Sequence, residues 1–267
     1  MTISGPATDQ HQATCDALER STPLLTDALR RAPGSTRPTK MRWTNAEIGA
    51  HLLASVIEAN KSSRGEASVY DASGPTAQTD EQMVASVAER DPAALADEIG
   101  RRTAEFLATV RRLSGSQSVR TPRATIGTLA GLLALDHHLH GGQFAETAGT
   151  TWTGNVADMH APLMYVLPYA FDPFAARGYS GSFTLKLRGV APVPYAIDNG
   201  VLTMEHAGRI DCTIVADPQT FLRFGIGVVS QLRATLTGKI LAGGRKPWRA
   251  FAVNRLFPPI AHGGVAK

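Results

Sequence analysis

Apolar residues in the first half of the chain recur every three or four positions, the spacing of a helix with one buried face. The stretch 9–32 has this spacing, and Pro23 inside it predicts an interruption or a kink. A second helix is predicted from Thr44, because Thr44 followed by Glu47 is the capping-box pattern at a helix start. Both stretches are expected to pack one face against a common core.

Two further helical stretches follow before residue 150. The clearest part of the third is 91–113, with Pro92 at its first helical position and either Asp80 or Asp91 as its N-terminal cap. The fourth is predicted over 125–147. Since no strand-like segment separates the four, the first half is predicted to be an up-and-down four-helix bundle.

The pattern changes after the fourth helix. A connection follows, in which 159–174 could form a short helix, and then come strand-like segments such as "FTLKLRG", whose apolar residues alternate. The tripeptide "DNG" at 198–200 predicts a hairpin turn, and helical spacing returns from "DPQTFLRFGIG" onward. We therefore expect an α+β domain with an antiparallel sheet, a boundary near 149–158, and two domains over 1–152 and 153–267.

Composition fits a globular protein of two compact domains, with 43% hydrophobic and 19% charged residues among 267. No apolar run is long enough to span a membrane, and the first residues lack the basic start and apolar core of a signal peptide, so we expect a cytoplasmic protein with no membrane partner. Cys15 and Cys212 are far apart and are expected to be buried, reduced thiols.

Charge is distributed unevenly between the halves. Residues 1–149 hold 15 Lys/Arg and 17 Asp/Glu, whereas 150–267 hold 12 and 6, which gives −2 and +6. The basic residues are scattered and form no nucleic-acid motif, so no nucleic-acid partner is predicted. The oligomeric state is not indicated by the sequence.

The segment "LLALDHHLHGGQ" at 132–143 carries the densest candidate chemistry. On a helix, Asp136 and His140 share a face at i, i+4, His137 and His140 form a competing i, i+3 pair, and His138 points elsewhere. A third ligand would have to come from another helix, and His51 stands in an apolar helical context. Two imidazoles, one carboxylate and an open position are typical of catalytic zinc sites. The alternatives are hydrogen-bonded core histidines or a His-rich surface turn.

These residues carry a resemblance to a known family. "MRWTNAEIGAHLLAS" and "DHHLHGGQFAE" resemble the histidine-bearing blocks of DinB-like helical bundles, in particular the mycothiol-dependent maleylpyruvate isomerase branch. The second half, with "FTLKLRG", "YAIDNGVLTME" and "LTGKILAGGRKPW", resembles the sterol-carrier-protein-like domain that follows the bundle in that branch. The resemblance covers most of the chain in the expected order.

The resemblance implies a metal site and a cofactor. It places the metal ligands at His51, Asp136 and His140, although the family more often has Glu where this chain has Asp136. It implies a divalent ion, with zinc preferred, and mycothiol as thiol cosubstrate. His137 is then a candidate catalytic residue, as a proton relay, a substitute ligand or a supporting group, while Trp43 is expected to pack in the core. The residues that bind the thiol are not predicted.

The function expected from this resemblance is enzymatic. A zinc-bound thiolate would attack a small electrophile, which makes the chain a mycothiol-dependent S-transferase for conjugation or thiol exchange. One alternative is a mycothiol-dependent cis-trans isomerase of a maleylpyruvate-like diacid. Another is a non-catalytic carrier of hydrophobic ligands, because the second half resembles sterol-carrier domains. Basic residues such as Arg42, Arg223 and Arg245 could hold an anionic substrate, although a solvated surface role is favoured for each.

Overall fold

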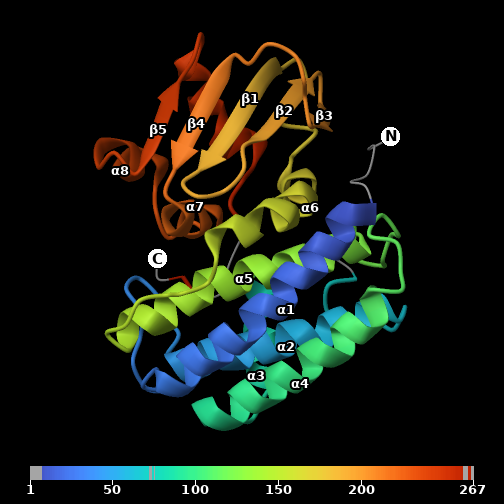
Figure 1. Cartoon of the computed structure of the whole chain (residues 1–267), viewed down its shortest axis with the longest axis vertical. Helices are drawn as coiled ribbons and strands as arrows, with labels where there is room; N and C mark the ends of the chain where they lie inside the picture. Colours follow the sequence, from blue (N-terminus) through green and yellow to red (C-terminus); the bar gives the residue numbers. More distant parts are fainter. Residues whose placement is uncertain (1–7, 72–73, 75, 261–263, 266–267) are drawn as a thin grey trace.

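A computed structural model describes residues 8–71, 74, 76–260 and 264–265. The chain forms a helical bundle and a sheet-containing unit stacked upon it (Figure 1). Each unit has its own hydrophobic core. Residues 1–7, on which the expected lack of a signal peptide partly rests, lie outside the described residues. Among the described helices, none is long and apolar enough to cross a lipid bilayer.

The bundle consists of four long helices and a short one. The long helices are α1 (Thr8–Arg31), α2 (Asn45–Ser63), α4 (Pro92–Val110) and α5 (Ile126–Thr147), and the short one is α3 (Ala77–Ser86). The predicted capping box of Thr44 and Glu47 is present, and Asp91 caps α4 ahead of Pro92. Asp80 does not cap α4, because it lies within α3, whose cap is Thr76. The four predicted helices are confirmed, and α3 is an addition to them.

Pro23 does not interrupt the first helix. Helix α1 runs continuously from Thr8 to Arg31 with Pro23 inside it, so the predicted interruption is wrong, and the alternative of a kink stays a prediction. The apolar side of α1 is buried both before and after Pro23, at Leu18, Leu25 and Leu29. Tertiary packing supplies most of a helix's stability in a folded protein and can outweigh a local break.

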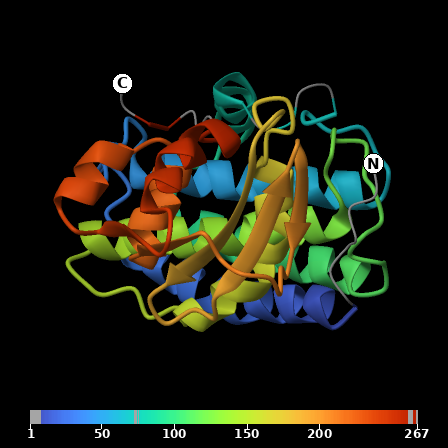
Figure 2. The ribbon, with the colours of Figure 1, turned by 90° about the horizontal axis from the view of Figure 1, so that it is seen from above.

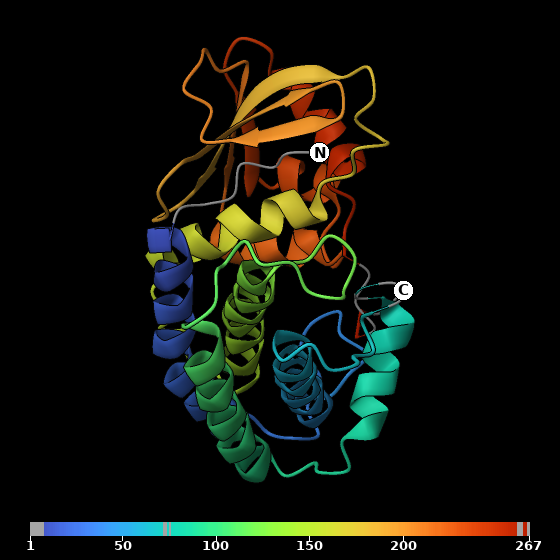
Figure 3. The same cartoon turned by 90° about the vertical axis from the view of Figure 1, so that its right-hand side faces the viewer.

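Helix α6 (His160–Ala170) follows a short 3₁₀ turn, η1 (Val156–Met159), and lies between the bundle and the sheet (Figure 3). It belongs to the chain beyond the predicted domain boundary, yet it contacts α5 and α1. Two glycines of α5 allow this close approach. A Cβ at Gly127 would overlap the ring of Tyr165, and one at Gly131 would lie 3.1 Å from the carbonyl oxygen of Pro162.

The sheet has five strands in the order β3-β2-β1-β4-β5. The strands are β1 (Ser180–Leu187), β2 (Val193–Asp198), β3 (Val201–Met204), β4 (Cys212–Ala216) and β5 (Ile240–Gly243). The predicted hairpin is confirmed between β2 and β3, where Asn199 and Gly200 adopt the positive φ angles that a tight hairpin turn needs. The prediction of an antiparallel sheet is wrong at one pair, since β1 and β4 run parallel. The chain passes from β3, at one edge, back across to β4 beside β1, which makes the sheet mixed.

Short helices complete the sheet unit, seen from above in Figure 2. They are α7 (Pro218–Gly225), α8 (Gln231–Leu236), η2 (Pro247–Ala252) and α9 (Val253–Leu256). Cys212, on β4, and Cys15, on α1, are both buried and free, as predicted. The core beneath the sheet also contains Leu135 and Leu139 of α5, whereas Leu129 and Leu133 of the same helix belong to the bundle core. Helix α5 is therefore a wall shared by both units.

The close contact at Gly127 yields a stability prediction. Gly127→Ala should lower the free energy of unfolding by about 1 to 3 kcal/mol, because the new methyl group must displace the buried ring of Tyr165. Gly100→Ala is the matched control. Gly100 also lies within a helix but has open space around it, so alanine should stabilise by about 0.5 to 1 kcal/mol through helix propensity. Urea unfolding of both variants measures the contrast, and equal stabilisation would contradict the packing of α6 on α5.

Candidate functional site

A small polar pocket lies where α2, α3, α5 and α6 meet. Its volume is about 90 Å³. Helix α2 contributes His51 and Ser55, α3 contributes Asp80, and α5 contributes Asp136. Tyr70, from the loop after α2, Thr121, before α5, and Tyr169, at the end of α6, complete its polar lining, and the rest of the wall is apolar. Elements far apart in the sequence thus bring ionisable and hydroxyl groups to one point.

His51 and His140 face each other across the interface between α2 and α5. Their ring centroids are 5.7 Å apart, and the rings are nearly perpendicular at 68°. Two imidazoles that share a tetrahedral zinc at Zn–N distances of about 2.0 to 2.1 Å have ring centroids roughly 5 to 6 Å apart. The spacing of this pair therefore fits a shared divalent ion.

Gln143 orients the ring of His140. The Nδ1 atom of His140 lies 2.7 Å from the side-chain oxygen Oε1 of Gln143, one turn further along α5. Because a carbonyl oxygen can only accept, Nδ1 carries the proton and Nε2 has the lone pair of the neutral ring. A hydrogen bond on the other ring nitrogen is the usual support of a metal-binding histidine.

Burial keeps both histidines neutral. Loss of solvation, together with a smaller contribution from the neighbouring His140, lowers the pKa of His51 to about 3. The pKa of His140 falls to about 4 for the same reason, although the hydrogen bond with Gln143 opposes the shift. Neutral imidazole is the form that binds metal ions, so no proton has to be displaced from a second ring nitrogen.

Asp136 lies one helical turn before His140 and lines the same pocket as His51. Burial raises the pKa of its carboxyl group to about 8, and the negative charge of Asp80 contributes to the increase. Asp80 is itself only 3% exposed. Two carboxyl groups facing one buried pocket favour a cation, which would stabilise the charged form of Asp136.

The three predicted ligands do not form a closed set. In the described part of the chain, no three His, Cys, Asp or Glu side chains converge closely enough to hold a metal ion. His51 and His140 are paired, and Asp136 lies in the pocket that His51 lines. The chemistry of the donors and the spacing of the imidazoles fit a divalent ion, and ligation by Asp136 requires its carboxylate to turn toward the imidazole pair.

His137 and His138 face other elements. His137 Nδ1 is 2.9 Å from the hydroxyl oxygen of Ser21, on α1. His138 Nδ1 accepts a hydrogen bond of 3.3 Å from the indole of Trp152, and its backbone carbonyl accepts one from Gln219. His138 is 1% exposed, so a surface role is wrong. Neither histidine lines the polar pocket.

Trp43 packs in the bundle core, as expected, with its ring 5.3 Å from that of His51. The basic residues considered for an anionic substrate lie elsewhere. Arg42 pairs with Glu81, Arg223 with Glu146, and Arg245 with Asp211. None of these three arginines lines the pocket.

Five polar residues of the pocket were absent from the predicted site: Ser55, Tyr70, Asp80, Thr121 and Tyr169. Burial and the charge of Asp80 raise the pKa of Tyr70, and a hydrogen bond joins Tyr70 to Ser55. Tyr70 belongs to a loop without periodicity, which gave no signal of its position. Asp80 did have one, because Thr76 and Thr79 form the capping box of α3, so the acidic side chain of Asp80 is not its cap.

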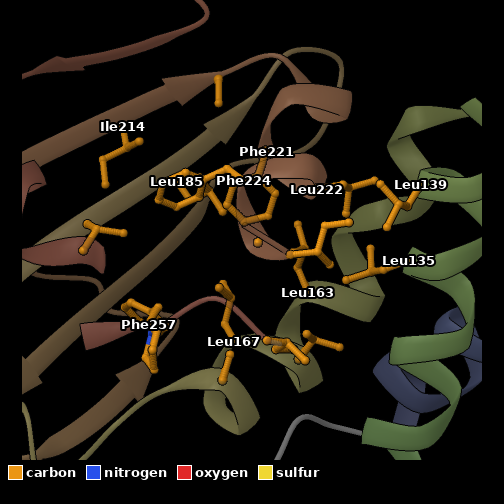
Figure 4. A pocket seen from close by; sticks show the side chains of 18 of the residues that line it. Leu135, Leu139, Leu163, Leu167, Leu185, Ile214, Phe221, Leu222, Phe224 and Phe257 are labelled. Carbon is orange, nitrogen blue, oxygen red and sulfur yellow. The ribbon is translucent and has the colours of Figure 1, made fainter. Parts of the chain in front are cut away.

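A second cavity adjoins the polar pocket. It has a volume of about 150 Å³ and lies between α5, α6, α7 and the sheet (Figure 4). Its walls are almost wholly apolar, with Leu135, Leu163, Leu185 and Phe224 among them. Both cavities are lined by the same four residues at their junction: Leu132, Asp136, Ile226 and Ile260.

Comparisons with known proteins show the fold. No family model matches the chain, and no curated protein matches its sequence. The solved structure of the mycothiol-dependent maleylpyruvate isomerase matches with a TM-score of 0.54 at 12% identity, over 91% of this chain and 96% of that one. A histidine-to-alanine mutant of that enzyme matches over the same shares with a TM-score of 0.55 at 11% identity. The predicted resemblance is thus confirmed at the level of fold.

The buried histidines predict how stability depends on pH in the absence of metal. Burial lowers the pKa of His51 and His137 to about 3 and of His138 and His140 to about 4, so the unfolded chain binds protons below pH 6.5 that the folded chain does not. Stability should therefore fall between pH 6.5 and 5 by about 1 to 2 kcal/mol for each histidine. The raised pKa of Asp136 partly offsets this loss of stability, because the folded chain holds one proton there that the unfolded chain releases.

Urea unfolding at several pH values in the presence of a chelator measures the slope. His138→Gln should reduce the slope by about one proton, because it removes one histidine that is neutral in the folded chain and charged in the unfolded chain. A wild-type stability that stays flat or rises toward pH 5 would contradict the burial of neutral histidines around α5.

Proposed function

We propose that the chain is a metal-dependent S-transferase that joins a small thiol to an electrophile. The observation that carries this proposal is the pair of buried, neutral imidazoles of His51 and His140, spaced as on one tetrahedral ion, beside the carboxyl group of Asp136. Mycothiol is the proposed thiol, since the enzyme that shares the fold is described as mycothiol-dependent.

His51, Asp136 and His140 would hold the ion, with zinc as the first candidate. Two neutral imidazoles and one carboxylate leave a divalent ion with a net positive charge, and Gln143 fixes the ring of His140 for binding. Such an ion would lower the pKa of a thiol bound to it, so that the sulfur reacts as a thiolate near neutral pH.

Asp80 is proposed to accept the thiol proton, because its carboxyl group lines the pocket beside Asp136. The sulfur then forms a bond to the electrophilic carbon, the bond from that carbon to its leaving group breaks, and the leaving group departs with the bonding electron pair. Asp80 then transfers the proton to the departing group. The thiol and the electrophile are thereby converted into a thioether and the acid of the leaving group. His137 has no step in this scheme, because Ser21 binds its ring on another side of α5.

The lining of the pocket favours transfer over isomerisation of a diacid. Asp80 and Asp136 line it, and no Lys or Arg is found among its described lining residues. With Asp136 bound to the ion, a dicarboxylate substrate would still meet the negative charge of Asp80 without a basic side chain to bind it. A neutral electrophile avoids this repulsion.

A carrier of hydrophobic ligands is the second candidate, favoured by the apolar cavity beside the polar pocket. The carrier gives no reason for neutral histidines and carboxyl groups to meet at the end of that cavity. Metal binding distinguishes the two proposed functions, because the S-transferase requires a metal ion and the carrier does not.

Metal titration tests the proposed site. Protein purified without a histidine tag and stripped with a chelator should bind about one zinc per chain. His51→Ala and His140→Ala should each lower the affinity for zinc at least a hundredfold, because each removes one of the two imidazoles proposed to bind the ion. His138→Ala is the matched control, as a buried histidine of the same helix whose ring faces Trp152 and not His51, and should retain the ion. Failure of the wild-type protein to bind zinc, cobalt or manganese would refute the S-transferase proposal.

Asp80→Asn separates proton transfer from metal binding. With mycothiol and monochlorobimane, which releases chloride when sulfur bonds to it, this change should lower kcat by about 10² or more while the zinc content stays at the wild-type value. Glu81→Gln, at the next residue on the exposed side of α3, should leave both unchanged. Wild-type kcat in Asp80→Asn would remove Asp80 from the mechanism.

A further inference from the structure

The apolar cavity between the bundle and the sheet has an acidic side chain at one end of its described lining and apolar side chains along almost all of the rest. Its described lining includes Asp136 as the sole ionisable acid, and Tyr195 as the sole other side chain with a polar atom. In Figure 4, Leu135 and Leu139 reach it from α5, Phe221 and Leu222 from α7, and Leu185 from the sheet. A ligand that fills this space must be apolar along most of its length.

The single acidic end of the cavity is also the site of the proposed chemistry. Asp136, Leu132, Ile226 and Ile260 line both cavities, so the apolar space and the polar pocket adjoin at these residues. A molecule that occupied both would have its polar end beside His51 and Asp136 and its apolar end under the sheet. The two cavities together thus fit an amphipathic occupant.

We propose that the electrophile used by this chain has an alkyl or aryl tail of medium length, which binds in the cavity between α5, α6, α7 and the sheet. This inference rests on the proposed S-transferase function and adds the class of substrate. A cavity of about 150 Å³ lined by aliphatic and aromatic side chains is large enough for a benzene-sized group. Burial of that tail holds the reactive carbon beside Asp136 and positions it for attack.

Binding of simple apolar probes tests the tail site without metal or thiol. Calorimetric titration of the chelator-treated full chain with butan-1-ol, hexan-1-ol and octan-1-ol should show affinity rising about three- to fourfold for each added methylene until the cavity is filled. Suberate, a diacid of eight carbons, should not bind measurably. Equal affinity for butanol and octanol, or tight binding of suberate, would overturn the proposal.

Two substitutions in the wall locate the bound probe. Ala216→Leu adds bulk on β4, where Ala216 is buried against the cavity, and Ile226→Trp adds bulk at the junction of the cavities, where Ile226 is only partly buried and a folded variant is expected. Each substitution should lower the affinity for octan-1-ol at least tenfold. Phe174→Ala is the control, because Phe174 is 72% exposed and lines neither cavity. Wild-type octanol affinity in a folded Ile226→Trp variant would place the probe elsewhere.

Turnover distinguishes failure of the tail site from failure of the S-transferase. With zinc, mycothiol and n-alkyl bromoacetates from methyl to octyl, kcat/KM of the wild type should rise with the length of the alkyl chain. In Ile226→Trp, kcat/KM should no longer depend on chain length. Turnover that is equal for all chain lengths would keep the S-transferase and refute the tail site. Chain-length-dependent binding of the alcohols without turnover or zinc binding would keep the cavity as a ligand site and refute the S-transferase.

Discussion

Burial of most of α5 between the two units is the constraint on which the rest of the structure depends. The helix contacts α1, α2, α6 and α7, and it contributes leucines to the cores of both units. A helix enclosed in this way has little surface for solvent, so each buried polar group on it needs a partner or a function. Its glycines serve the same enclosure, since Gly127 and Gly131 let α6 approach, and Gly141 and Gly142 lie against Trp152 and Gln219.

Most of the polar groups of α5 are accounted for by such partners. His137 is paired with Ser21, His138 with Trp152, and His140 with Gln143. Asp136 is different, because burial and Asp80 both disfavour its charged form and its pKa rises to about 8. A buried carboxyl group beside a second one costs free energy of folding unless a cation or a proton occupies the pocket. That cost is reasonable for a binding site and hard to explain as packing, which is the physical reason for proposing a metal ion there.

Helical periodicity predicted most of what depends on one element alone. It placed the long helices and the pairing of Asp136 with His140 on one face of α5, and the turn residues "DNG" placed the hairpin at Asn199 and Gly200. It could not assign His137 and His138, because their roles depend on which helices cover the remaining sides of α5. The parallel pairing of β1 with β4 and the arrival of Tyr70 and Asp80 in the pocket depend on long-range packing, for which neither spacing nor propensity gives a signal. Low-identity fold similarity likewise extends to the architecture and leaves the site to be argued from its residues.

The division into two cores gives the proposed chemistry its setting. The polar pocket belongs to the bundle, the apolar cavity is roofed by the sheet, and Asp136 lies where they meet. Neither unit alone would enclose both ends of an amphipathic substrate. The bundle supplies the ionisable groups on rigid helices, and the sheet unit excludes water from the adjoining space, which strengthens electrostatic interactions at the reacting carbon. Substrate choice can therefore change through residues of β1, β4 and α7 that line the cavity while His51 and His140 stay in place, so the sheet unit would set specificity for chemistry that the bundle performs.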